Sequence, residues 1–132
     1  MVSAYFCEGL VNDILIIEQY EGKIILFFNR ASGKFEKPSK EEYRKLKFVD
    51  TGFCNIIWRK NEKELGFEFQ QIFYTKFEPR RHYTVYLLSY KNKSVYVLEF
   101  YDGSSLDYDF KIFEKLENAL IEICNSESKY NS

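Results

Sequence analysis

The sequence has few of the residues on which catalysis and metal binding usually depend. Among its 132 residues there is one histidine, His82, and there are three widely separated cysteines, Cys7, Cys54 and Cys124. Acid–base and nucleophilic catalysis need a poised base, and a zinc site needs clustered Cys or His ligands. We therefore expect no catalytic residue, no metal site and no cofactor. The cysteines are expected to be small buried residues in a reducing compartment.

Recognisable nucleotide-binding and hydrolase motifs are also absent. The sequence contains no Walker loop and no GxGxxG, GxSxG, HExxH or calcium-loop pattern. Segment 102–107 is rich in side-chain oxygens, but it lacks the ligand spacing and the distal glutamate of an EF-hand. A turn that leads into a helix explains it better. These absences favour a binding protein over an enzyme.

Long apolar runs are missing as well. The longest are 14–17 and 24–28, far short of the roughly 20 residues that cross a bilayer. The first residues have neither the basic region nor the apolar stretch of a secretory signal. We expect a cytoplasmic protein with no membrane segment.

Length and charge set the next bounds. A chain of 132 residues with 19% aromatic residues can close a hydrophobic core without disulfides or metals. We therefore expect one domain over 1–132. The net charge of −1 gives the whole molecule no attraction to nucleic acid. Attraction to a charged partner can therefore come only from the local charge of particular segments.

The hydrophobic pattern predicts an α+β fold with one curved antiparallel sheet of about six strands. Most connections between the strands are too short for parallel crossovers. Several strands are apolar on both faces, so the sheet must curl, be covered by helices or offer an aromatic face to a partner. The predicted strands are 13–19 and 23–30, joined by a turn at 20–22, and then 52–60, 66–74, 83–90 and 94–101.

Two helices complete the predicted fold. A short helix near 39–47 has Ser39 as its N-cap and Glu42 in the capping-box position. A C-terminal amphipathic helix near 108–125 has Asp107 and Asp109 at its N-terminus, where carboxylates accept unpaired amide hydrogens. The polar tail from 126 is expected to fray. The apolar residues of the C-terminal helix are Phe110, Phe113, Leu116, Leu120 and Cys124.

The strongest local charge lies in the last third of the chain. Segment 99–127 has eight acidic residues against two lysines, a local net charge of −6. Acids on a helix exterior commonly provide solubility; the functional alternative is a surface that steers a basic partner, with aromatic side chains supplying affinity. The candidate partner-binding residues are Asp102, Asp107, Asp109, Glu114, Glu122, Tyr86, Tyr90 and Tyr96.

The segments YTVYL at 83–87 and SVYVL at 94–98 predict an aromatic hairpin, and the predicted amphipathic helix follows it. This layout resembles that of bacterial immunity proteins. The nearest group is that of contact-dependent growth inhibition and polymorphic-toxin systems, and the likeness covers roughly 83–125. The resemblance implies a non-catalytic cytosolic protein that binds and neutralises a cognate toxin, often a basic nuclease, by covering its active or substrate site.

Two other interpretations stay open. Strands that are apolar on both faces could line the cavity of a small-ligand-binding barrel or cup. Arg80, Arg81 and His82 could instead bind or process nucleic acid, with the arginines holding a phosphate and the histidine moving a proton. The simpler alternative is a polar strand start whose arginines pair with nearby acids. Nucleic acid is therefore not the partner we expect.

Overall fold

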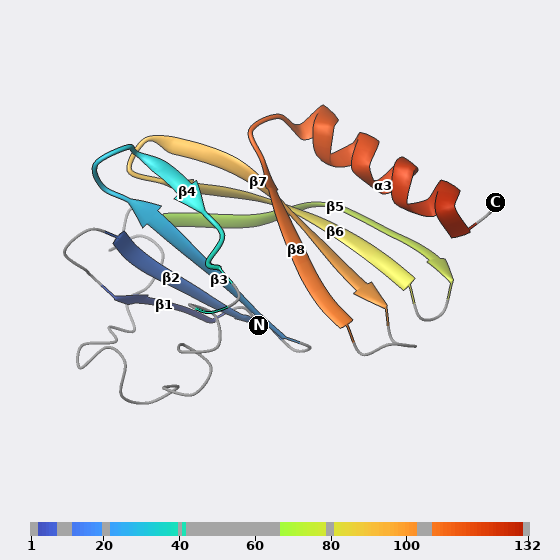
Figure 1. Cartoon of the computed structure of the whole chain (residues 1–132), viewed down its shortest axis with the longest axis horizontal. Helices are drawn as coiled ribbons and strands as arrows, with labels where there is room; N and C mark the ends of the chain where they lie inside the picture. Colours follow the sequence, from blue (N-terminus) through green and yellow to red (C-terminus); the bar gives the residue numbers. More distant parts are fainter. Residues whose placement is uncertain are drawn as a thin grey trace. The chain divides into compact units, whose positions relative to one another are not determined.

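The computed structural model describes residues 3–7, 12–19, 22–39, 41, 67–78, 81–102 and 107–130. Over these residues the fold is α+β, with antiparallel strands in two sheets of four and the helix α3 near the C-terminus (Figure 1). The chain divides into two compact units, Met1–Leu65 and Gly66–Ser132, each with its own sheet. The predicted fold class is confirmed, but the single curved sheet is wrong. The single domain stays a prediction.

The first unit is built by strands that follow one another in chain order. They are β1 (Ser3–Cys7), β2 (Asn12–Gln19), β3 (Gly22–Asn29) and the short β4 (Lys34–Glu36). The predicted N-terminal hairpin is confirmed as β2 and β3. A turn follows β3, in which Gly33 has a φ of 68° and donates its amide hydrogen to the Asn29 carbonyl at 2.8 Å. Glycine adopts this left-handed conformation without strain.

The second unit contains the longer strands, again in chain order. They are β5 (Phe67–Glu78), β6 (Arg81–Tyr90), β7 (Lys93–Asp102) and β8 (Asp107–Phe113). Lys91 and Asn92 form the turn between β6 and β7, with φ angles of 49° and 63°. Two positive φ angles are what a two-residue type I′ hairpin requires. The predicted central hairpin is thus confirmed, and β5 is longer than predicted.

The C-terminal segment differs from the prediction. Strand β8 occupies the start of the predicted helix, and the helix α3 runs over Leu116–Tyr130. In β8, Tyr108, Phe110 and Ile112 alternate with polar residues, a period of two that suits a strand, and β8 pairs along β7. Asp107 and Asp109 are therefore strand residues and do not cap the helix. The tail from 126 is helical as far as Tyr130 and was wrongly expected to fray.

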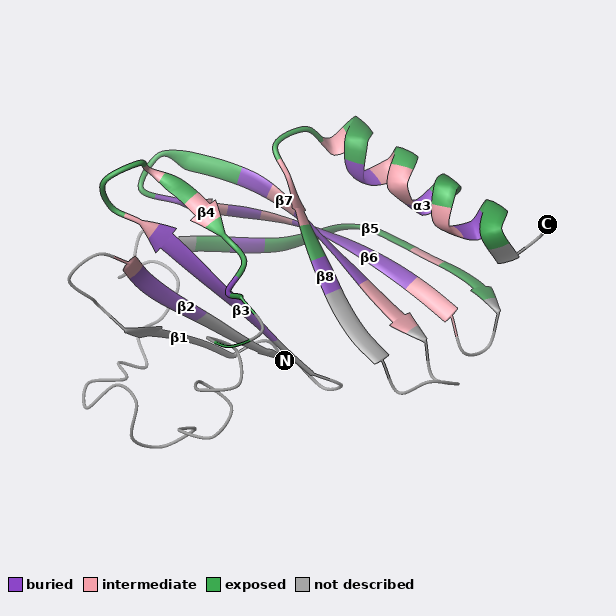
Figure 2. Cartoon of the chain, in the orientation of Figure 1, coloured by how far each residue is buried: buried purple, intermediate pink, exposed green. Residues whose placement is uncertain are grey.

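Helix α3 packs one side onto this sheet. Ala119 and Ile123 are 0% and 4% exposed and join a core cluster with Tyr83, Val85 and Leu98. Figure 2 shows this buried side facing the strands. The predicted stripe was right for Leu116 and Leu120, which pack against the cluster. It was wrong for Cys124, which is exposed and has a free thiol.

Some predicted features fall outside the described residues. The strand predicted at 52–60 lies there entirely, together with Cys54. Of the short helix predicted near 39–47, only Ser39 and Glu41 are described.

Candidate functional site

Part of the acidic charge of segment 99–127 is not on the surface. Glu99 and Glu127 are only 5% and 6% exposed. Glu122 accepts a hydrogen bond from the Lys111 ammonium at 2.7 Å, a pair whose charges already cancel within the net −6. Because two of the acids are buried, the local net charge of −6 overstates the field that a partner would meet.

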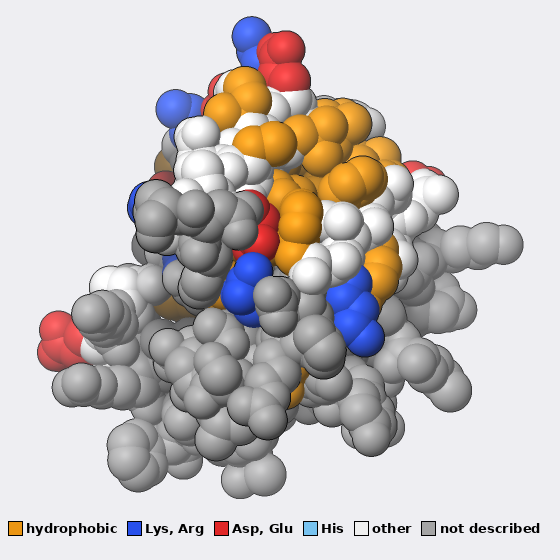
Figure 3. All heavy atoms as spheres, turned by 90° about the vertical axis from the view of Figure 1, so that its right-hand side faces the viewer, with side chains coloured by type: hydrophobic (Ala, Val, Ile, Leu, Met, Phe, Trp, Pro, Cys, Tyr) orange, Lys and Arg blue, Asp and Glu red, His pale blue; other side chains and the backbone are white. Residues whose placement is uncertain are grey.

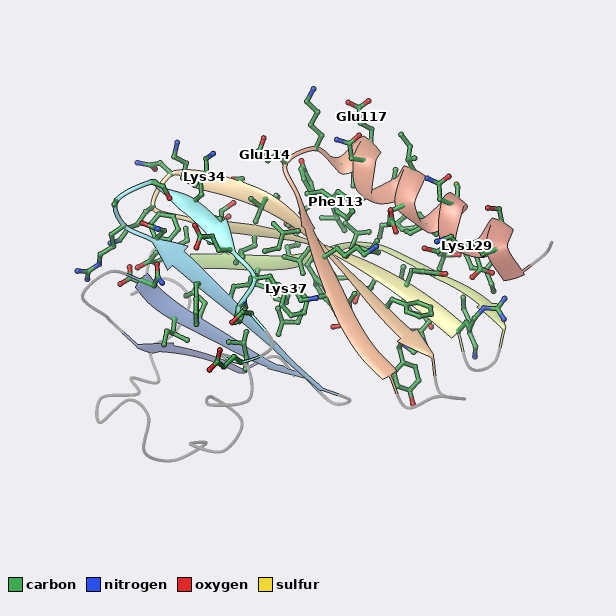
Figure 4. The ribbon with its side chains drawn as sticks, viewed as in Figure 1. Lys34, Lys37, Phe113, Glu114, Glu117 and Lys129 are labelled. Atoms are coloured by element: carbon green, nitrogen blue, oxygen red, sulfur yellow. The ribbon has the colours of Figure 1, made fainter. Side chains whose placement is uncertain are left out.

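The other acidic candidates lie at opposite ends of β8. Asp102 and Asp107 are opposite each other where β7 ends and β8 begins, with Asp109 two residues further along β8. Glu114 is exposed just after the other end of β8, roughly 20 Å away at the rise of an extended strand. Glu117, in the first turn of α3, points away from the sheet (Figure 4). The predicted acidic residues thus do not converge on one site.

Two of the three candidate tyrosines belong to the core. Tyr86 and Tyr90 are 6% and 3% exposed on β6, a central strand of its sheet. The Tyr86 ring stacks on Phe69 with 4.5 Å between ring centroids. Tyr96 is partly buried and packs against the cluster beneath α3. Tyr86 and Tyr90 are therefore buried side chains, and their part in partner binding stays a prediction.

The Arg81 guanidinium is occupied by Glu127. Arg81 donates from Nη2 to Glu127 Oε1 at 2.9 Å and from Nε to Oε2 at 3.2 Å. The Tyr83 hydroxyl donates to the same Oε2 at 2.7 Å. A bidentate carboxylate fills the positions through which an arginine would hold a phosphate. The simpler interpretation of the arginine cluster therefore describes Arg81, while Arg80 lies outside the described residues.

This network keeps Glu127 ionised. Hydrogen bonds from Arg81 lower the pKa of the Glu127 carboxyl below its ordinary value, and Tyr83 and the Arg81 charge act in the same direction. Burial opposes the effect but does not cancel it. The network joins the C-terminal half of α3 to β6. Sequence reasoning missed Glu127, although its spacing from Leu116, Leu120 and Ile123 continues the helical stripe.

His82 lies between aromatic rings. Its ring centroid is 4.8 Å from that of Tyr101, in a stacked arrangement, and 5.7 Å from that of Tyr74.

In the described part of the chain, no group of three or more Cys, His, Asp or Glu side chains could hold a metal ion. The same part contains no helix with the length and apolar character to span a membrane.

Strand β5 presents the largest exposed hydrophobic side chains of the second unit. It forms an edge of its sheet and pairs only with β6 among the described strands. Most of its side chains are exposed (Figure 2). Figure 3 shows hydrophobic side chains gathered on the face that forms the right-hand side of Figure 1. The exposed large residues on β5, which we call the β5 patch, are Ile72, Phe73, Tyr74 and Phe77. The patch wraps around the edge of the sheet, because Tyr74 contacts His82 and Phe77 contacts Tyr83, consecutive residues of β6 that point to opposite faces.

A pocket of about 170 Å³ lies in the second unit, between α3 and the strands β6, β7 and β8. The barrel of the small-ligand interpretation is not formed by the described strands, because the outer strands of each sheet do not pair with each other. The residues that line the pocket include Tyr83, Leu98, Phe100, Phe110, Lys111, Glu122 and Ser126.

Comparison of the chain with protein-family models, with curated proteins and with solved structures found no match.

Proposed function

We propose that this chain is a non-catalytic immunity protein that binds and neutralises a cognate toxin in the bacterial cytoplasm. The observation that supports binding to a protein is the β5 patch on the edge strand. Phe73, Tyr74 and Phe77 are 39%, 50% and 51% exposed. Aromatic side chains of this kind provide most of the binding energy in protein interfaces. The fit to an immunity role rests on the resemblance of segment 83–125.

The edge position adds a second means of recognition. A strand with a free edge can pair its backbone with an extended segment of a partner. In β5 the ladder with β6 is irregular between Gln71 and Phe73 and between Lys76 and Glu78. Such bulges twist an edge and limit pairing with arbitrary strands. Glu68, before the patch, and Lys76, between Tyr74 and Phe77, are exposed on the same strand and would contribute to register with a charged partner.

The acidic residues have a narrower role in this proposal than the sequence indicated. Glu114 and Glu117 remain exposed and available to a basic toxin. Charge pairs at the rim of an interface act mainly on the association rate and its salt dependence. We therefore assign affinity to the β5 patch and electrostatic steering to the exposed acids.

The test begins with capture of the partner from the native host at low and high salt, identified by mass spectrometry. The captured protein is then expressed alone and with the wild-type chain, and growth is measured. We expect it to be toxic alone and harmless in the presence of this chain. Phe77→Asp should weaken binding by about 2 kcal/mol, or roughly 30-fold in Kd, because it removes an interface aromatic.

The chain offers a matched control in Ile121. This residue is 54% exposed, about as much as Phe77, but it lies on the outer side of α3. Ile121→Asp should therefore leave rescue and Kd unchanged. Loss of rescue with Ile121→Asp and its retention with Phe77→Asp would place the interface away from β5. A captured protein with no toxicity of its own would contradict the immunity role.

A further inference from the structure

The pocket beneath α3 has a wall of large apolar side chains that are held in place. Tyr83, Leu98 and Phe110 are 1%, 3% and 5% exposed. The Tyr83 ring lies 5.0 Å from the Phe100 ring between centroids, tilted by 30°. The Tyr83 hydroxyl is fixed by its hydrogen bond to Glu127. The wall is thus formed in advance, which lowers the entropic cost of binding a ligand.

The rim of the pocket is polar but electrically balanced. Lys111 Nζ and Glu122 Oε1 are 2.7 Å apart, so opposite charges meet at the mouth. In the described part of the chain, Glu122 Oε2 and the Ser126 hydroxyl have no hydrogen-bond partner. The rim therefore has no net charge from this pair, and it can both accept hydrogen bonds from a ligand and donate them to it.

From these features we infer that the pocket binds a neutral single-ring aromatic molecule with one hydrogen-bonding group. The volume of about 170 Å³ is slightly larger than the cavity of about 150 Å³ that holds benzene in an engineered protein. A ring fits against Phe100, a partly exposed aromatic residue of the pocket, where edge and face contacts between aromatics are favourable. A hydroxyl on that ring would lie at the pocket mouth, where Glu122 and Ser126 can hydrogen-bond to it. The inference does not rest on the proposed function, although Phe77 of the β5 patch contacts the pocket residue Tyr83, with 5.9 Å between ring centroids.

The test uses 4-fluorophenol as the probe, observed by fluorine NMR and by amide shifts of the labelled full-length chain. We expect saturable shifts at Leu98, Lys111 and Glu122. Cyclohexanol should bind more weakly, because it keeps the hydroxyl but has no aromatic face. Benzoate and benzylamine should also bind more weakly, because each brings a charge to a rim that is already balanced. Absence of saturable shifts with 4-fluorophenol would overturn the inference.

Two serines on α3 provide matched variants. Ser126→Phe fills the pocket mouth and should weaken 4-fluorophenol binding at least about tenfold, the loss of about 1.4 kcal/mol. Ser128→Phe adds the same ring at an exposed position two residues away and should leave binding unchanged. Equal binding by the two variants would show that the probe does not occupy this pocket.

A third variant tests the role of the rim and does not depend on filling the pocket. Glu122→Gln leaves the Lys111 charge unbalanced with little change in shape. Benzoate should then bind more tightly than it does to the wild type, while benzylamine should not. If the order of the charged probes is the same in both proteins, the Lys111–Glu122 pair does not select the ligand. An unchanged amide spectrum away from the pocket would verify that each variant is folded.

Discussion

At the scale of single residues, the contact between Glu127, Arg81 and Tyr83 has the clearest energetic consequence. Glu127→Gln keeps the shape of the side chain but removes the carboxylate charge that pairs with Arg81, whose side chain is 16% exposed. Breaking a mostly buried ion pair by removing one partner is costly. We expect the free energy of unfolding, measured with urea, to fall by about 3 kcal/mol. Glu117→Gln, at an exposed position of the same helix, should change it by less than about 0.5 kcal/mol.

The two substitutions separate the proposed ion pair from general effects of removing a carboxylate. Equal losses of stability for Glu127→Gln and Glu117→Gln would mean that the contact with Arg81 adds nothing. A change in the slope of unfolding free energy against urea concentration, without a change in the midpoint concentration, would instead mean that the substitution alters the compactness of the unfolded state.

The same carboxylate predicts a dependence of stability on pH. The pKa of Glu127 is lowered in the folded state, mainly by hydrogen bonds from Arg81. Its stabilisation is therefore complete above the pKa of the unfolded chain and is lost as the pH falls through the folded pKa. We expect wild type and Glu127→Gln to differ fully at pH 6 and to converge below about pH 4.3, the ordinary glutamate value. A difference that stays constant down to pH 3 would contradict this assignment.

At the scale of secondary-structure elements, the sequence predicted the parts that depend on local pattern. The β2–β3 and β6–β7 hairpins follow from apolar strands on either side of short polar turns. The prediction for segment 107–113 was wrong because the spacing of its apolar residues fits both the period of a helix and the period of a strand. Phe110, Phe113 and Leu116 suit a helical face, while Tyr108, Phe110 and Ile112 suit a strand. The choice depends on the open edge of β7, the preceding strand, which offers unpaired backbone groups that the periodicity of 107–113 alone does not reveal.

The candidate site was harder to predict for a related reason. Tyr86 and Tyr90 lie on a strand that is apolar on both faces, and the sequence does not say which face is covered. Both are buried in the structure. The β5 patch was missed because exposure depends on β5 being an edge, and sheet order is not encoded in local periodicity. Glu122 looked like free surface charge because its partner, Lys111, was assigned to the same helix and is in fact on β8.

At the scale of the whole molecule, charge and the β5 patch together predict reversible self-association. The net charge is −1 at pH 7 and the isoelectric point is about 5.9. Near pH 6 there is no net repulsion between copies, and an exposed apolar edge strand then favours pairing. We expect light scattering to report a larger mean mass at pH 6 than at pH 8, where the molecule is more negative.

Neutral substitutions can show whether β5 is responsible without changing the isoelectric point. Phe77→Asn should remove most of the increase at pH 6, because it interrupts the apolar strip on the edge strand. Ile121→Asn removes a side chain of similar exposure from α3 and should leave the increase unchanged. The same mean mass at both pH values in the wild type would show that the two bulges in β5 already block pairing between copies. In that case a partner would bind β5 through its side chains, and the loss caused by Phe77→Asp would have to come from the aromatic contact alone.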